Sequence, residues 1–211
     1  MGLAMLGAVS QGILWGVMVL GVFITYKLLD IADLTVDGSF ALGGSVCAVL
    51  VVSGVDPVLA IFAAMLAGMI AGAVTGFLHT VFEIPAILAG ILTQIALWSV
   101  NLRIMGKSNT PLLRVDTLFS SVTDATGLPQ NVASIIVGLI FAILIIVALY
   151  WFFGTEIGSA CRATGNNEAM VRALGVDTKV TKMIALTLSN GLVGLSGGLI
   201  CESQGYADIG M

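Results

Sequence analysis

Long apolar stretches without charge alternate with short polar segments along this 211-residue chain. Each stretch is close to the ~20 residues that a helix needs to cross a hydrocarbon layer ~30 Å thick. The uncharged stretches are 1–26, 38–55, 57–82, 84–102, 130–155 and 183–201. Because a charge at the bilayer centre costs at least ~2.5–3.5 kcal/mol, this exclusion is typical of membrane spans.

The stretch 38–55 is the shortest of the six and contains Gly43 and Gly44, so it either crosses the membrane or forms a re-entrant segment. We therefore predict an all-α, polytopic transmembrane protein with five to six membrane segments. The whole chain, 1–211, is expected to form one transmembrane domain. If all six segments cross, the N-terminus is extracytoplasmic; if 38–55 is re-entrant, it is cytoplasmic.

The composition supports the same class. Hydrophobic residues make up 58% of the chain and charged residues only 9%, whereas about a quarter of a soluble domain is charged. Disorder is excluded as well, because it needs low hydrophobicity and high charge. A net charge of −4 lacks the basic field of a nucleic-acid binder, so the lipid bilayer is the expected surrounding. Lys27 follows the first apolar stretch, which favours a retained span over a secretory signal peptide.

Glycine is abundant, with 26 residues, and recurs at intervals of three or four inside the apolar stretches. Residues at that spacing share a helix face and let a second backbone approach closely. The repeats are Gly12 and Gly16; Gly68, Gly72 and Gly76; and Gly191, Gly194 and Gly197. They predict tight packing, either within a compact helical body or between two copies of the chain.

Several chemistries have no support in the sequence. Cys47, Cys161 and Cys201 are far apart, which indicates neither a zinc site nor a disulfide framework. His79 is the only histidine, and it lies near the end of an apolar stretch. Neither an HExxH motif nor a GxxxxGK[ST] phosphate loop is present. We therefore assign no catalytic residue, metal ligand or cofactor, and expect that the chain does not itself hydrolyse ATP.

A first polar segment covers residues 27–39. Polar residues from Asp33 to Asp37 alternate with apolar ones, which predicts a short extended piece. Asp37 or Ser39 would then cap the following helix. A helix that starts at membrane depth would direct free N–H groups and a positive dipole end at a carboxylate or polar solute. An ordinary interfacial turn explains the same pattern.

Two further polar segments follow. Residues 103–131 are predicted to form an extramembrane loop, with a short interfacial helix at 115–122. This loop is either solvated or a docking surface. In 154–182 the polar residues at 164–168 predict a helix start, and Gly175 predicts its end. The helix of about two turns between them is amphipathic and needs a surface, either the lipid interface or a groove on a partner.

These segments carry a family resemblance. The sequences GSACRATGNNE at 158–168 and MVRALG at 170–175 strongly resemble the cytoplasmic coupling loop of ABC importer permeases of the branched-chain amino acid/ribose type. Within that type the chain is most similar to uncharacterised or tryptophan/tyrosine-type permeases. The other matching segments are DLTVDGSF at 33–40, LAGILT at 88–93, NLRIMGK at 101–107 and SNGL at 189–192.

The resemblance implies a permease subunit of a bacterial ABC importer, a multi-pass protein of the plasma membrane. Its expected partners are an ABC ATPase subunit, an extracytoplasmic solute-binding protein and a second permease subunit in a homodimer. The expected solute is small and polar, an amino acid in the first place. The short helix would bind a groove of the ATPase through its apolar face, and Arg162, Glu168 and Arg172 would pair with charges of that partner. The predicted coupling residues are Arg162, Gly165, Asn166, Asn167, Glu168, Ala169, Met170, Arg172, Ala173, Leu174 and Gly175.

Polar residues inside or capping the apolar stretches are candidates for the solute pathway, because an unpaired polar group in hydrocarbon costs free energy. Such residues face a watery cavity or a neighbouring helix, so interhelical hydrogen bonds explain them equally well. The candidates are Asp37, Ser39, Thr93, Gln94, Asn101 and Asn190.

Two alternative functions and two further expectations complete the sequence-based picture. A secondary carrier or channel-like protein without an ATPase is the main alternative, although the absence of an ionisable residue in mid-span speaks against a proton- or sodium-driven carrier. A non-transporting helical scaffold is the third class. Residues 204–211 resemble a family segment that leads into further spanning helices, which predicts a C-terminally truncated permease. Four basic residues in 154–182 against three in 103–131 favour a cytoplasmic position for the former.

Overall fold

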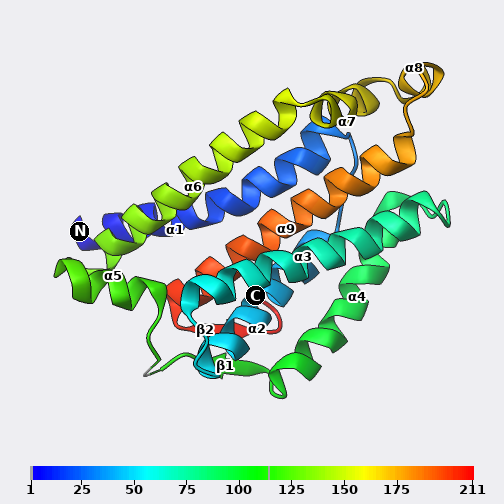
Figure 1. Cartoon of the computed structure of the whole chain (residues 1–211). Coiled ribbons are helices and arrows are strands. Elements are labelled where there is room, and N and C mark those ends of the chain that lie inside the picture. Colours follow the sequence, from blue (N-terminus) through cyan, green and yellow to red (C-terminus); the bar gives the residue numbers. More distant parts are fainter. Residues whose placement is uncertain (1, 114) are drawn as a thin grey trace.

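Six helices of the computed structural model are long and apolar enough to cross a membrane, and they lie together in one bundle (Figure 1). The structure describes residues 2–113 and 115–211. The six are α1 (Gly2–Phe23), α2 (Thr35–Val52), α3 (Pro57–Thr80), α4 (Ala86–Met105), α6 (Gln130–Gly154) and α9 (Thr178–Gln204). The remaining elements are the π-helical turn η1 (Ile24–Leu28), β1 (Asn109–Pro111), α5 (Leu118–Thr126), α7 (Glu156–Asn166), α8 (Glu168–Ala173) and β2 (Tyr206–Asp208).

Helix α9 occupies the centre of the bundle and packs against α1, α2 and α3. Its contacts with α3 and α2 are made by glycines, as the glycine spacing predicts. A Cβ on Gly194 would lie 2.6 Å from the Ala64 carbonyl oxygen of α3. A Cβ on Gly197 would strike the Phe40 carbonyl of α2. The backbones therefore approach each other directly, without intervening side chains.

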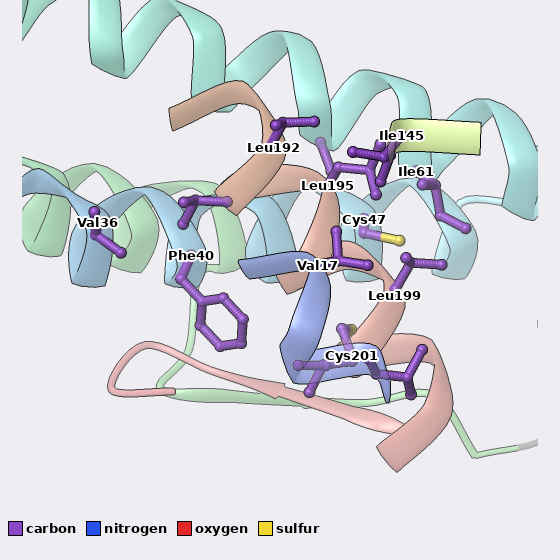
Figure 2. Packing of buried hydrophobic residues seen from close by; sticks show 14 of the residues in the cluster. Val17, Val36, Phe40, Cys47, Ile61, Ile145, Leu192, Leu195, Leu199 and Cys201 are labelled. Atoms are coloured by element: carbon purple, nitrogen blue, oxygen red, sulfur yellow. The ribbon is translucent and has the colours of Figure 1, made fainter. Parts of the chain in front are cut away.

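Apolar side chains fill the space that the glycines leave around α9. Leu195 and Leu199 of α9 are buried, and neighbours from three other helices gather around them (Figure 2). These neighbours are Val17 of α1, Phe40 and Cys47 of α2, and Ile61 of α3. Two serines of α9 add hydrogen bonds to the α1 backbone, from Ser189 Oγ to the Gly21 carbonyl at 2.7 Å and from Ser196 Oγ to the Leu14 carbonyl at 3.1 Å.

The start of α2 differs from the sequence-based prediction. The helix begins at Thr35, so the predicted extended piece does not reach Asp37, and neither Asp37 nor Ser39 is a cap. Instead the Thr35 amide donates to Asp33 Oδ1 at 2.9 Å. Because that carboxylate satisfies the free N–H group of Thr35, the helix starts earlier than predicted, and the β-branched Thr35 and Val36 are helical and buried.

Helix α2 also begins inside the bundle. Asp33 Oδ2 accepts a hydrogen bond from Asn190 Nδ2 at 2.7 Å, and Asn190 is the thirteenth of the 27 residues of α9. The chain after η1 therefore runs inward to the middle of α9 before α2 turns toward the other end of the bundle. This arrangement agrees with a helix that starts at depth, and the 18 residues of α2 rank among the six candidate spans.

The two ends of the bundle carry different connections. Helices α7 and α8 lie at one end, where Lys179 Nζ also pairs with Glu83 Oε1 of the α3–α4 turn at 3.2 Å. Because five candidate spans precede α8, the N-terminal end of α1 lies at the opposite end (Figure 1). That opposite end also carries the antiparallel β1–β2 ribbon and α5.

Helix α5 is the short helix predicted within the loop 103–131, but it covers Leu118–Thr126 rather than 115–122. Its start is set by a capping box, in which the Ser120 amide donates to Thr117 Oγ1 and the Thr117 amide donates to Ser120 Oγ. The buried Glu202 of α9 contributes a further bond, because its Oε2 accepts from the Leu118 amide at 2.8 Å. Helix α5 is thereby fixed to the end of α9.

Candidate functional site

The short helix α8 forms where the polar pattern predicts it. The Asn167 side chain caps it by accepting a hydrogen bond from the Met170 amide at 3.0 Å, and Glu168 lies in its first turn. The chain after it turns at Gly175, which adopts a φ of +85° that favours glycine. The first part of the predicted start, residues 164–166, belongs instead to the end of α7.

One face of α8 is apolar and exposed. Val171 is buried against the rest of the chain and fixes the helix in place. The stripe that the sequence predicts, formed by Ala169, Met170, Ala173 and Leu174, is exposed, with Leu174 at 74%. This stripe can contact a lipid surface or a partner protein, whereas the rest of the described chain does not cover it.

Glu168 connects α8 to the first turns of α9. Its carboxylate pairs with Arg172 Nη2 at 2.8 Å and with Lys182 Nζ at 2.7 Å, and it accepts a hydrogen bond from Thr178 Oγ1 at 3.0 Å. The hydrogen bond from Lys182 is the main reason why the pKa of Glu168 lies below its ordinary value; Thr178 and the charge of Arg172 act in the same direction. Glu168 and Arg172 thus pair within the chain, and their pairing with a partner stays a prediction. Their i, i+4 spacing is the signal that favours the internal pair.

Other predicted coupling residues serve different purposes. A Cβ on Gly165 would strike the Leu28 carbonyl, so this glycine allows α7 to pack against the end of η1. Arg162 is exposed and donates to Ser159 Oγ of its own helix at 3.4 Å. Asn166 is exposed at the end of α7. Arg162 and Asn166 therefore remain available to a partner.

The six predicted pathway residues divide into two groups. In the first group, Ser39 Oγ donates to Asn190 Oδ1 at 2.6 Å, and both residues are fully buried. Thr93 Oγ1 donates to the Ala89 carbonyl of its own helix at 3.0 Å, and Thr93 borders an apolar groove instead of a polar cavity. These three side chains are satisfied by the protein itself. The Ser39–Asn190 bond is the interhelical alternative to a pathway role, whereas the bond of Thr93 lies within α4.

The second group lies together on a cavity between α2 and α4, the α2–α4 cavity, with a volume of about 180 Å³. Gln94 Nε2 donates to Asp37 Oδ2 at 3.3 Å, and Asp37 is exposed to this space. Asn101 is only 1% exposed, yet neither of its amide atoms has a hydrogen-bond partner among the described residues. The lining residues are Asp37, Gly38, Ala41, Gln94, Trp98, Asn101, Ile209, Gly210 and Met211.

Two features of this cavity were missed by sequence reasoning. Trp98 lies on the face of α4 that Gln94 and Asn101 share, and the i, i+4, i+7 spacing of these three residues is the signal for it. In addition, Asp37 brings an ionisable group to this cavity from the first turn of α2, at the start of a candidate span and not in its middle. Since Asp33 and Ser39 both bond Asn190 at the middle of α9, Asp37 between them lies within the bundle.

Comparison with known proteins gives a consistent picture. The family model described as branched-chain amino acid transport system, permease component, matches residues 4–211. A tyrosine transport system permease protein of Clostridioides difficile is 38% identical over 206 residues, which are 98% of this chain and 67% of that protein. An uncharacterised protein of Rickettsia prowazekii is 35% identical over 97% of this chain and 70% of its own length. A ribose import permease of Escherichia coli is 30% identical over 78% and 51%, respectively. No solved structure matches.

Proposed function

We propose that this chain carries an amino acid across the plasma membrane. It belongs to the family of permease components of branched-chain amino acid transport systems and is a multi-pass subunit of a bacterial ABC importer. Tyrosine is the first candidate, since the relative with 38% identity is named for tyrosine transport. A separate ABC ATPase subunit hydrolyses ATP, an extracytoplasmic solute-binding protein delivers the solute, and a second copy of the permease completes the pathway.

The observation that carries the proposed coupling to an ATPase is the exposed apolar face of α8 at one end of the bundle. A six-residue helix has little stability of its own, and here a side-chain cap, a buried Val171 and the Glu168 pairs hold it in place. Holding an apolar stripe rigidly toward the aqueous end of the bundle favours docking into a groove of a partner. In the proposed orientation this end is cytoplasmic, and the N-terminus is extracytoplasmic.

The contacts of α9 provide a connection from α8 to the α2–α4 cavity. Lys182 binds Glu168 of α8, and Asn190 lies eight residues further along α9, about 12 Å of helix rise. Asn190 bonds both Asp33 and Ser39, which flank the first turn of α2 that carries Asp37. A displacement of α8 by the ATPase would therefore move α9, and with it the start of α2 at the cavity.

The test compares two exposed leucines at opposite ends of the bundle. Leu174 beside α8 is 74% exposed, and Leu113 in the loop after β1 is 78% exposed. We expect Leu174→Arg, and likewise Ala173→Arg, to abolish co-purification of the cognate ATPase subunit from membranes while the permease still inserts and remains monodisperse. Leu113→Arg should leave the ATPase bound. Equal recovery of the ATPase with all three variants would contradict a docking role of α8.

A further inference from the structure

The α2–α4 cavity presents an acid without a cation and an amide without a partner. Asp37 takes part in none of the ion pairs among the described residues. Its carboxylate accepts one side-chain hydrogen bond from them, which Gln94 donates. The Asn101 amide has neither its donor nor its acceptor satisfied, although it is almost wholly buried. Because buried amides in proteins nearly always have partners, this one indicates that the cavity receives a molecule with polar groups.

A charge at this place needs an explanation of its own. Asp37 lies in the first turn of α2, where a carboxylate interacts favourably with the helix dipole. That interaction does not require exposure, however, and Asp37 is exposed within a bundle of apolar spans. Since a carboxylate facing lipid is strongly disfavoured, its open side faces water, a solute, a second copy or a further polypeptide segment.

The polar groups are spaced along one face of α4. Gln94, Trp98 and Asn101 follow each other at i, i+4 and i+7, so the two amides are separated by about 10 Å of helix rise with the indole between them. Asp37 adjoins Gln94 at one end of this row, and Asn101 is at the other. The row therefore offers an anion, an aromatic surface and an amide in that order.

We propose that this cavity is a binding site for an amino acid with a hydroxyl-tipped aromatic side chain. The solute ammonium pairs with Asp37, its ring lies against Trp98, and its hydroxyl exchanges hydrogen bonds with the Asn101 amide. The volume of about 180 Å³ suits one aromatic ring, since an engineered cavity of about 150 Å³ holds benzene. This assignment rests on the proposed import of an amino acid and adds the residues that select it.

The assignment has a consequence for specificity. A site that hydrogen-bonds a solute hydroxyl rejects the analogue that lacks it, because its own polar group is then left unpaired. Tyrosine and phenylalanine differ only in that hydroxyl, so Asn101 should distinguish them. Asp37 contacts a group that both share, so it should not.

The experiment measures equilibrium binding of radiolabelled L-tyrosine and L-phenylalanine to the purified full-length permease with its ATPase, without the solute-binding protein. We expect Asn101→Leu to weaken tyrosine binding about tenfold or more and to remove the preference over phenylalanine. Asp37→Asn should weaken both ligands by a similar factor. Asn101→Gln and Asp37→Glu are expected to retain part of the binding that the first variants lose. They also test the site if the first variants do not fold.

Two control variants separate these effects from general damage. Asp116→Asn removes an exposed acid outside the cavity, and Thr80→Val removes a buried hydroxyl of α3; both should leave binding unchanged. Wild-type binding of tyrosine and phenylalanine with equal affinity, or an unchanged preference in Asn101→Leu, would overturn the assignment. Uptake of amino acids by the complete importer in that case would show that the proposed function stands, whereas no ATPase-dependent uptake of any amino acid would contradict the proposed function itself.

Discussion

The contact between α3 and α9 at Gly194 gives a sharp prediction for the variant Gly194→Ala. An added Cβ would lie 2.6 Å from the Ala64 carbonyl oxygen and 3.0 Å from the Gly68 Cα. Even close C···O contacts in proteins are about 3.3–3.6 Å, so the two helices would have to separate by roughly 0.7–1 Å. Gly43 of α2 also packs against the Gly194 backbone, so a second helix resists this movement of α9.

The expected cost follows from that geometry. One excess methyl group in a packed interior destabilises a protein by about 1–3 kcal/mol. Both atoms that obstruct the Gly194 Cβ belong to backbone, which yields less readily than a flexible side chain, so we expect the upper end, about 3 kcal/mol. At roughly 2–4 °C per kcal/mol for a chain of this length, the melting temperature should fall by about 6–12 °C.

The assay is thermal unfolding of the detergent-purified protein, followed by intrinsic fluorescence and by size-exclusion recovery after heating. Gly12→Ala in α1 is the matched control, because a Cβ there meets no atom within 4 Å. Alanine is the better helix former by about 1 kcal/mol, so this control should melt at or above the wild-type temperature. If Gly194→Ala melts within a degree of Gly12→Ala, the direct backbone contact between α3 and α9 is wrong.

Three further results are expected. Glu168→Gln should retain the bound ATPase but lower the number of solute molecules imported per ATP, because it removes the charge that binds Lys182; an unchanged ratio would contradict this connection. Because the pKa of Glu168 is lowered on folding, its stabilisation is complete above the ordinary glutamate value of about 4.3 and is lost as the pH falls through the lower folded value. Melting temperatures of wild type and Glu168→Gln should therefore converge at acidic pH, and the difference stays small because the side chain is 37% exposed. Finally, a maleimide should not label the folded protein at neutral pH, because Cys47, Cys161 and Cys201 are all buried. In addition, Cys161 Sγ donates to the Thr181 carbonyl at 3.6 Å, and burial raises the pKa of this thiol.

The spans and the short helix α8 could be predicted because their signals are local. Charge exclusion marks helices of the required length, and Asn167 and Gly175 mark the limits of α8. The start of α2 could not, because it depends on Asn190, which is 157 residues from Asp33 in sequence. Polar residues at 33–39 allow several caps, and only the partner on α9 selects one of them.

The same limit applies to the candidate site. In the sequence, Ser39 and Asn101 are equivalent, since each is a polar residue within an apolar stretch. The fold gives Ser39 a partner in Asn190 and leaves Asn101 without one, so only Asn101 lines a cavity with unused hydrogen-bonding capacity. Glycines differ in the same way: a Cβ added to Gly68 would meet the backbone of α9, whereas one added to Gly12 would meet no packing atom of the described residues within 4 Å. Periodicity identifies a helix face but not what packs on it.

The glycine contacts also bear on how a movement at α8 reaches the cavity. Where bulky flexible side chains separate two helices, a small shift can be absorbed by changes of rotamer. At Gly194 and Gly197 the backbone of α9 lies directly against α3 and α2, so a shift of α9 must displace those backbones as well. Glu168 and Lys182 join α8 to the first turns of this rigid helix. In the proposed mechanism, the close backbone contacts of α9 and the Glu168–Lys182 pair link α8 to the α2–α4 cavity. Replacing Gly197 by alanine should then impair import even where α8 still binds its ATPase.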